Sequence, residues 1–381
     1  MKILLVAPAH PLRGGIAASS ERLAVAFQAA GHQVEILSFS LQYPDFLFPG
    51  TTQFTDDPAP ADLHITTALN SINPFNWIIL GKKYSQKGFD MVVCRYWLPF
   101  MSPCLGTFLR FFKGKTPVIT LADNIIPHEK RIGDKQFTAY FLGACDAVVA
   151  MSNAVVEDAR QFVPEKPIVF HPHPLYDTYG EALPQAEALE KLQLSPNYKY
   201  LLFFGFIRAY KGLDLLLEAL ADARLADLPL KLIVAGEFYE SPEKYEQLIK
   251  KYHLEQKLIR ATHFIAADQV ATYFSAADLI VQPYKSATQS GVSQVAYHFE
   301  KPIIVTNVGG LAEIIPHQKV GYVVEVNAEA IATAIVQFFD KKNNLTNWQG
   351  NIQEEKRRFR WESMVTVFTD LQKQLQKNVE H

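Results

Sequence analysis

The chain has 381 residues, more than one compact hydrophobic core usually holds, so two domains are expected. Hydrophobic residues make up 49% of the sequence and charged residues 20%, a balance that suits a globular protein and excludes a disordered one. The formal net charge of -2 excludes a global attraction to nucleic acid, which would need a local basic patch, so no nucleic-acid partner is expected.

The cysteines and the N-terminus indicate a reducing, cytoplasmic setting. Cys94, Cys104 and Cys145 are odd in number and irregularly spaced, unlike a disulfide framework. The N-terminal apolar run stops at Pro8, too short for a secretory signal, and no stretch approaches the roughly 20 apolar residues that span a bilayer. No Cys/His cluster has zinc-ligand spacing and no Asp-x-Asp occurs, so no metal site is expected.

The first forty residues predict one strand-helix-strand unit. A strand is expected at Lys2 to Ala7, a helix at Ile16 to Ala30 closed by Gly31, and a second strand at Gln33 to Phe39. This order is typical of a doubly wound parallel sheet. Further strands are predicted at residues 90–95, 117–121 and 146–150. From residue 164 to 198 the pattern breaks among six prolines and indicates a linker.

A second series of alternating strands and helices follows this linker. Strands are predicted at residues 199–204, 230–235, 258–263, 278–281, 302–306 and 320–324, and helices at 213–224, 242–252, 268–276 and 290–299. The chain is therefore expected to carry two Rossmann-like domains of the α/β class. Ligands of such sheets bind at the carboxyl ends of the strands, and the cleft between the two domains is the expected site.

The loop after the strand at 199–204 carries the strongest chemical signal. It contains Gly205, which allows a sharp turn, followed by Arg208 and Lys211 three residues apart. That spacing predicts that both cations point the same way from one helical turn at a helix N-terminus, where the helix dipole already favours an anion. A guanidinium fork and an ammonium point charge suit a diphosphate, and the alternative is a pair of solvated surface cations.

Three further loops carry weaker signals. The polar loop at 282–292 presents small residues before a helix, either to an oxygen-rich ligand or as an ordinary loop with Ser290 as helix cap. Gly14 and Gly15 precede the first helix but do not form a dinucleotide fingerprint, which disfavours a nicotinamide cofactor. The segment at 123–129 places Asp123 and His128 after a strand, as catalytic groups or as ordinary structural residues.

With these motifs in order, the sequence resembles the retaining GT-B glycosyltransferases of family four, in their bacterial branch. The resemblance covers nearly the whole chain and is carried by GFIRAYKG at 205–212, SAADLIVQPY at 275–284, SATQSGVSQVAYHFEKPIIVTNVGGLAEII at 286–315 and DNIIPHEK at 123–130. It implies a GT-B fold with two Rossmann-like doubly wound domains facing each other across a cleft. The implied division is an acceptor domain at 1–180, a linker at 181–198, a donor domain at 199–355 and a helix at about 356–378 that returns to the first domain.

The resemblance also assigns roles to residues. Those matching Arg208 and Lys211 bind the donor diphosphate, backbone groups near Ser290 contact the donor, and the turn at Phe264 lies near the base. The predicted catalytic residues are Arg208, Lys211, Asp123 and His128, and the predicted donor-binding residues are Gly14, Gly15, Gly205, Phe264, Ile265, Thr288, Gln289, Ser290, Gly291, Val292 and Glu313.

The sequence departs from the family pattern at two positions and in one loop. The family motif has two glutamates, the second of which holds the ribose hydroxyls; their positions are occupied here by Ala287 and Val295, whose side chains accept no hydrogen bond. Asp123 stands where many relatives have a histidine, and it could still bind a sugar hydroxyl. Candidate substitutes for the glutamates are Thr288, Gln289, Gln294 and Glu313.

The expected function is metal-independent transfer of a sugar from a UDP- or GDP-linked donor to a glycan or lipid-linked acceptor, with retention of anomeric configuration. Two alternatives stay open. The missing glutamates favour a non-catalytic nucleotide-sugar binding protein, and the architecture also suits a nucleotide-sugar epimerase. No cofactor or metal is expected beyond the nucleotide-sugar co-substrate.

Two apolar segments with basic ends, 74–83 and 98–115, suggest peripheral contact with the inner face of the cell membrane. Aromatic side chains beside lysine and arginine suit the boundary between acyl chains and anionic headgroups. The alternative, which we favour, is that both segments bury one face against the predicted sheet.

Overall fold

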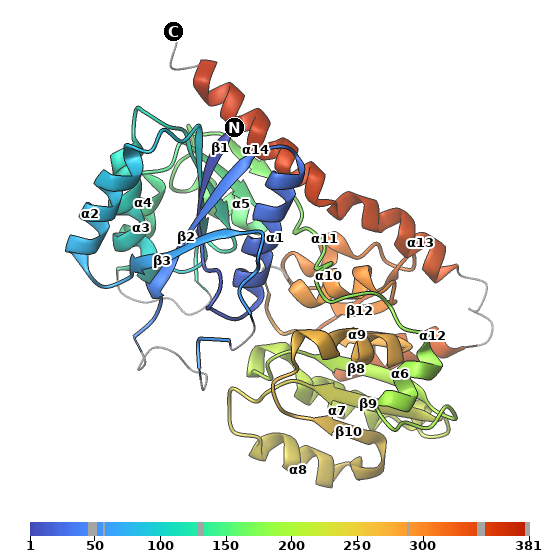
Figure 1. The fold of residues 1–381 in the computed structure, drawn as a ribbon. Helices are drawn as coiled ribbons and strands as arrows, with labels where there is room; N and C mark the ends of the chain where they lie inside the picture. The colour runs from blue at the N-terminus through green and yellow to red at the C-terminus, as the bar shows by residue number, and fades with distance from the viewer. Residues whose placement is uncertain (45–51, 56–57, 128–132, 288–289, 341–346, 378–381) are drawn as a thin grey trace. The chain divides into compact units, whose positions relative to one another are not determined.

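The computed structural model describes residues 1–44, 52–55, 58–127, 133–287, 290–340 and 347–377. The chain divides into two compact units: a first unit of Met1–Pro174 with Arg360–His381, and a second unit of Leu175–Phe359. Each unit contains one parallel β-sheet with helices packed against it (Figure 1). In sequence, the first unit is interrupted by the whole of the second.

The first unit has a seven-stranded sheet in the order β3-β2-β1-β4-β5-β6-β7, and every neighbouring pair is parallel. Its strands are β1 Lys2–Val6, β2 Gln33–Leu41, β3 His64–Asn70, β4 Met91–Tyr96, β5 Val118–Ala122, β6 Ala147–Ala150 and β7 Ile168–Phe170. Its helices are α1 Gly15–Ala29, α2 Pro74–Ser85, η2 Pro99–Met101, α3 Ser102–Leu109, η3 Arg110–Phe112, α4 Asp134–Leu142, α5 Asn153–Arg160 and α14 Trp361–Lys377.

The second unit has a six-stranded parallel sheet in the order β10-β9-β8-β11-β12-β13. Its strands are β8 Lys199–Phe204, β9 Leu230–Ala235, β10 Leu258–Ala261, β11 Leu279–Gln282, β12 Ile303–Thr306 and β13 Gly321–Val324. Its helices are α6 Gln185–Lys191, η4 Ala209–Lys211, α7 Leu213–Leu220, η5 Ala223–Leu225, α8 Glu243–Lys251, η6 Glu255–Lys257, α9 Ala267–Ala276, α10 Gly291–His298, α11 Leu311–Ile314, α12 Ala328–Phe339, α13 Trp348–Glu355 and η8 Lys356–Phe359.

Both sheets are buried on both faces, as their continuous apolar strands predict. In β1, Leu4 and Val6 belong to one hydrophobic cluster, whereas Ile3 and Leu5 belong to another on the opposite face. Successive residues of β8 and β11 divide between two clusters of the second unit in the same way. The period-two alternation of a strand therefore sends neighbouring residues into separate cores.

The strand order places the loops that matter for a ligand. In the second unit the order reverses between β8 and β11, so the loops that follow these two strands leave the same edge in opposite directions. The first unit reverses in the same way between β1 and β4. Open α/β sheets bind ligands at such switch points, outside the carboxyl ends of the strands.

The structure differs from the sequence-based prediction mainly at the sheet edges. β3 and β7, the two edge strands of the first sheet, were not predicted, and β7 lies within the stretch interpreted as a linker. The predicted linker at 181–198 contains α6, which packs beside α9 in the second unit. The helix predicted at 213–224 ends at Leu220, and η5 follows it. None of the described helices combines the length and apolar character needed to cross a bilayer.

Candidate functional site

The loop after β8 is a tight turn rather than the start of a regular helix. Gly205 has a φ of 93°, Arg208 is extended, and η4 forms a single turn that ends at Lys211. Gly212 then adopts the left-handed conformation with a φ of 70°, and a Cβ there would collide with the carbonyl oxygen of Pro283. The predicted helical turn is present as η4: Arg208 is its N-cap residue, Lys211 closes it, and the N–H of Lys211 donates to the carbonyl of Arg208 at 2.9 Å. That both side chains point the same way stays a prediction.

Lys211 is the buried cation of this loop. Its side chain is only 8% exposed, and burial, followed by the nearby charge of Arg208, lowers its pKa to about 8. Its Nζ lies 5.6 Å from the centre of the Tyr284 ring. A Cβ on Gly205 would lie 2.9 Å from that Nζ and 3.7 Å from Cγ2 of Val292, so the ammonium lies beside the start of α10. No carboxylate among the described residues lies within 4.0 Å of it.

The loop after β11 meets the loop after β8. The N–H of Lys285 donates to the carbonyl of Tyr210 at 2.6 Å, and the rings of Tyr210 and Tyr284 meet edge to face. Ser290 occupies the N-cap position of α10, but its side chain makes no capping hydrogen bond. The first-turn N–H groups at Gly291 and Val292 are therefore not capped by this serine, which argues against its interpretation as an ordinary helix cap.

The loop after β9 holds the Arg208 loop from the other side. The N–H of Ile207 donates to the carbonyl of Glu237 at 2.8 Å, and the N–H of Tyr239 donates to the carbonyl of Ile207 at 3.0 Å. The Glu240 carboxylate accepts from the N–H of Ala209 at 2.8 Å. The Tyr239 ring stacks on Phe206 with centroids 4.2 Å apart, and the Arg208 guanidinium carbon lies 5.0 Å from the Tyr239 centroid. Neither Tyr239 nor Glu240 was predicted from the sequence as a site residue.

The remaining donor-site residues of the second unit lie in neighbouring loops. Phe264 is 44% exposed and Ile265 is buried in the core, both after β10. Glu313 is half-buried on α11, which follows β12. Thr288, Gln289 and, in the first unit, His128 lie outside the described residues.

The positions of the two missing family glutamates are filled by core side chains. Ala287 and Val295 are both buried in the same hydrophobic cluster. Gln294, one of the candidate substitutes, is fully buried, and neither atom of its amide has a hydrogen-bond partner. Beside it in the sequence, Ser293 donates through Oγ to Oε1 of Gln282 at 2.8 Å, which leaves Nε2 of Gln282 unpartnered. The start of α10 and the end of β11 therefore each hold a buried amide with unpartnered atoms, Gln294 and Gln282.

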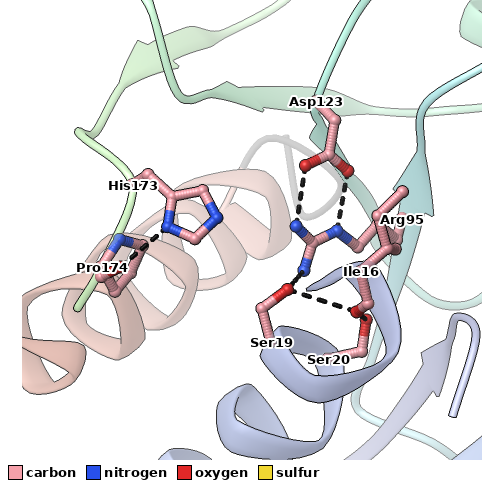
Figure 2. A network of polar contacts seen from close by, with 7 residues as sticks. All are labelled: Ile16, Ser19, Ser20, Arg95, Asp123, His173 and Pro174. Atoms are coloured by element: carbon pink, nitrogen blue, oxygen red, sulfur yellow. Dashed lines mark hydrogen bonds and ion pairs between the residues drawn. The ribbon is translucent and has the colours of Figure 1, made fainter. Parts of the chain in front are cut away.

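In the first unit, Asp123 is half of a buried ion pair. Its two carboxylate oxygens accept from Nε and Nη2 of Arg95, each at 2.7 Å, and Nη1 of Arg95 donates to Oγ of Ser19 at 2.6 Å (Figure 2). Arg95 lies on β4 and is 2% exposed, Asp123 follows β5, and Ser19 lies on α1. The network joins three elements at the carboxyl edge of the sheet, so Asp123 is positioned by Arg95 rather than presented alone.

His173 lies close to this network (Figure 2). His173 is buried, and its pKa falls to about 4 because burial, and next the charge of Arg95, disfavour its protonation. The Nδ1 atoms of His171 and His173 pair with the carbonyl oxygens of Pro172 and Pro174, at 2.7 Å each.

Gly14 is the exposed N-cap residue of α1 and Gly15 begins the helix, so no side chain caps its first turn. Within the described ranges, no group of three or more His, Cys, Asp or Glu could hold a metal ion.

Comparison with known proteins finds a family model that matches most of each unit. Residues 13–176 match Glycosyltransferase Family 4, and residues 184–355 match Glycosyl transferases group 1. The chain is 24% identical to the D-inositol 3-phosphate glycosyltransferase 2 of Catenulispora acidiphila over 308 residues, which cover 74% of this chain and 70% of the relative.

Two solved structures share the whole fold. Sucrose-phosphate synthase from Thermosynechococcus elongatus superposes with a TM-score of 0.75 at 18% identity, covering 99% of this chain and 100% of that one. Anabaena HepE, solved in complex with UDP-glucose, gives a TM-score of 0.72 at 15% identity with the same coverage. The predicted fold class is confirmed: two Rossmann-like parallel-sheet units in a GT-B chain.

Proposed function

We propose that this glycosyltransferase, with its family 4 domain followed by a group 1 domain, transfers a sugar from a nucleotide-sugar donor to a hydroxyl of a glycan or glycolipid acceptor. The observation that carries the proposal is the buried Lys211 beside the start of α10, with the charge of Arg208 close enough to lower its pKa. Fixed cations and backbone N–H groups stabilise the negative charge that builds on a departing nucleoside diphosphate. The complex of HepE with UDP-glucose supports a UDP-linked donor over a GDP-linked one.

The proposal includes three further points. Transfer needs no divalent ion, because two cations at the diphosphate position can neutralise the charge that a metal would otherwise meet. The anomeric configuration is retained, as expected from the resemblance to retaining family-four enzymes. The enzyme works in the cytoplasm, a setting supported by three free and buried cysteines.

A transfer assay tests this proposal. Nucleotide sugars are first screened by thermal shift, because a ligand that binds only the folded state raises its stability. Release of nucleoside diphosphate is then measured with candidate acceptors, with and without EDTA, and NMR of the fresh product gives the anomer. We expect release that depends on the acceptor and is unchanged by EDTA. Loss of transfer in EDTA that magnesium or manganese restores would refute metal independence, and an inverted linkage would refute retention.

Substitution of the cations tests the site itself. Arg208→Ala and Lys211→Ala should each lower kcat by roughly 100- to 1000-fold, the usual loss when one donor to a developing anion is removed. Arg224→Ala is the matched control, since Arg224 is a surface arginine of the same unit paired with Asp222. Near-normal turnover in both loop variants would show that neither residue binds the leaving group.

A second candidate function is a non-catalytic nucleotide-sugar binding protein. The buried Ala287 and Val295 favour it, because the resembled family has glutamates at these positions, the second of which holds the ribose hydroxyls. Binding of a nucleotide sugar without acceptor-dependent release would support this function. Conversion of the free donor into an isomer would instead indicate an epimerase.

A further inference from the structure

Helix α2 presents an outward face of large apolar side chains. Phe75 is 77% exposed, Ile79 64% and Ile72 52%, and no other large hydrophobic side chain in the described part of the chain is as exposed as these three. Ile78, at 38%, adds to the same surface. Phe75 and Ile79 are four residues apart, so they lie one above the other on one face of the helix. We name Ile72, Phe75, Ile78 and Ile79 the α2 apolar face.

This face is held rigidly outward by the opposite side of the helix. Asn73 caps α2 by accepting from the N–H groups of Phe75 and Asn76 at 3.1 and 3.3 Å. The Asn76 side chain accepts from the N–H of Asn70 at 2.9 Å and donates to the carbonyl of Ala68, while Trp77 donates to the carbonyl of Asn70. These bonds fix α2 to β3, so the helix cannot rotate to bury its apolar face. Figure 1 shows α2 as an outer layer of the first unit.

A group of unpaired lysines continues the apolar face at its C-terminal end. Lys82 and Lys83, in the last turn of α2, are exposed. Phe111 packs so closely on Gly81 that a Cβ there would collide with its ring, which brings the turn after η3 beside the end of α2. That turn adds the exposed Lys113 and Lys115. None of these four lysines forms an ion pair with another described residue.

The stretch of sequence around α2 is mostly basic, in a chain whose formal net charge is -2. Between residues 63 and 122 the only acid is Asp90, against seven basic residues: Lys82, Lys83, Lys87, Arg95, Arg110, Lys113 and Lys115. Three of the seven already have partners within the protein. Lys87 pairs with Glu35 and Arg95 with Asp123, while Arg110 donates to two backbone carbonyls and lies over the Tyr140 ring. The four free lysines therefore provide the charge available to an external anion.

We propose that the α2 apolar face and the four lysines dock this protein on an anionic bilayer surface. Apolar side chains on a fixed helix enter the acyl boundary, while lysines at one end meet lipid phosphates. Large exposed apolar side chains beside four lysines that form no ion pair with a described residue match an anionic bilayer, which offers an acyl boundary and phosphates side by side. This docking goes beyond the transfer reaction and does not depend on it.

The second segment considered from the sequence, residues 98–115, contributes little to this surface. Its apolar side chains Met101, Leu105, Phe108, Leu109 and Phe112 are buried in the core of the first unit. Arg110, bonded to Gly106 and Tyr140, is also unavailable to a headgroup. Only Lys113 and Lys115 remain as membrane contacts from that segment.

Vesicle sedimentation tests the docking surface on the full chain. The probes are phosphatidylcholine vesicles, with or without phosphatidylglycerol as one lipid in three, at low and moderate salt. The wild type should sediment only with the anionic vesicles, and less at moderate salt. Phe75→Ser with Ile79→Ser, and separately Lys82→Glu with Lys83→Glu, should each lower the partition coefficient on the order of 10-fold or more. All four side chains lie on the surface, so circular dichroism should show folded variants.

Matched controls separate this surface from general stickiness. Lys250→Glu with Lys251→Glu changes an equivalent exposed lysine pair in the last turn of α8, and Val25→Ser with Val326→Ser removes apolar groups that are exposed elsewhere. Both controls should bind like the wild type. The proposal is overturned if the folded wild type does not sediment, or if the controls lose binding as much as the α2 variants. It is also overturned if light scattering shows a dimer that Phe75→Ser with Ile79→Ser dissolves, because a second copy would then cover the face. None of these outcomes bears on the transfer reaction.

Discussion

Lys211 is 8% exposed, and burial together with the charge of Arg208 lowers its pKa to about 8. A buried cation that lacks a carboxylate partner is costly, because the interior solvates it poorly. A bound diphosphate would supply the missing negative charge. The residue therefore suits a site that is completed by its ligand and not by the protein alone.

The lowered pKa of Lys211 predicts a pH dependence of catalysis. The ratio kcat/KM reports the free enzyme, so it should fall as the pH rises through about 8 and Lys211 loses its proton. In Arg208→Gln the falling limb should move to higher pH, because the smaller of the two causes that lower the Lys211 pKa, the charge of Arg208, is removed while burial remains. Initial-rate profiles of kcat/KM between pH 6 and pH 10 would measure the falling limb in the wild type and in Arg208→Gln. A falling limb near pH 8 that persists in Lys211→Met would exclude Lys211 as its origin.

The lowered pKa of Lys211 also predicts how stability depends on pH: the protonated form that favours activity lowers the free energy of unfolding. The folded pKa is below the unfolded value of 10.5, so burying the charge costs stability fully below pH 8, and the cost fades as the pH rises to 10.5. Lys211→Met should therefore raise the free energy of unfolding by on the order of 2 kcal/mol at pH 7 while it abolishes most activity. Denaturant melts at pH 7 and pH 10 check this, and the gain should shrink at the higher pH.

Single residues also show where sequence reasoning stops. The motif around Arg208 and Lys211 was visible because its glycine, cations and spacing lie in one loop. The pair of Arg95 and Asp123 was not, because its partners are 28 residues apart and meet only through the pairing of β4 with β5. One signal was present: an arginine at the end of an otherwise apolar, buried strand must find a partner for its charge.

At the scale of elements, periodicity located the interior strands and missed the edges. β8 and β9 have the predicted bounds, because central parallel strands are continuous apolar runs. β3, with the sequence HITTALN, is an edge strand whose residues are mostly half-buried or exposed. β7 is an edge strand of three residues among prolines. A strand with one covered side and a polar neighbourhood lacks the signal that a buried strand carries.

The contacts between the loops after β8 and β9 lead to a prediction for Tyr239. Its ring stacks on Phe206 and lies under Arg208, so it positions the guanidinium. Tyr239→Ala should raise the donor KM roughly 3- to 30-fold, the range of one cation–π contact, with a smaller change in kcat. Tyr239→Phe should keep the donor KM of the wild type, because the ring and not the hydroxyl makes the contact with Arg208. Initial-rate kinetics with varied donor measure both values.

A matched control for Tyr239 exists in the same unit. The Nζ atom of Lys231 lies 4.5 Å from the ring centroid of Tyr198, an exposed residue just before β8. Tyr198→Ala removes a comparable contact and should leave KM unchanged. An equal rise in both alanine variants would show a general loss of stability in place of positioning.

At the scale of the whole molecule, the C-terminal segment of the chain packs in the same unit as its N-terminal residues. The second unit ends at Phe359, and α14 then packs its apolar side into the core of the first unit, where Phe368 meets Phe27 edge to face at 5.7 Å. Gln372 donates to the carbonyl of Asp90, and Ser363 is hydrogen-bonded to His171. The folding of the N-terminal residues therefore depends on the last helix of the chain.

This topology predicts where a C-terminal core substitution acts. Phe368→Ala should destabilise the first unit by about 3 to 5 kcal/mol, the usual cost of removing a buried phenylalanine ring. Hydrogen exchange should then show lost protection in β1 and α1, more than 300 residues away in sequence, with little change in β8 and β9. Phe274→Ala, a fully buried phenylalanine in the core of the second unit, is the matched control and should give the reverse pattern. If Phe368→Ala exposed both sheets equally, the two units would unfold as one cooperative body, and their separation into independent cores would be refuted.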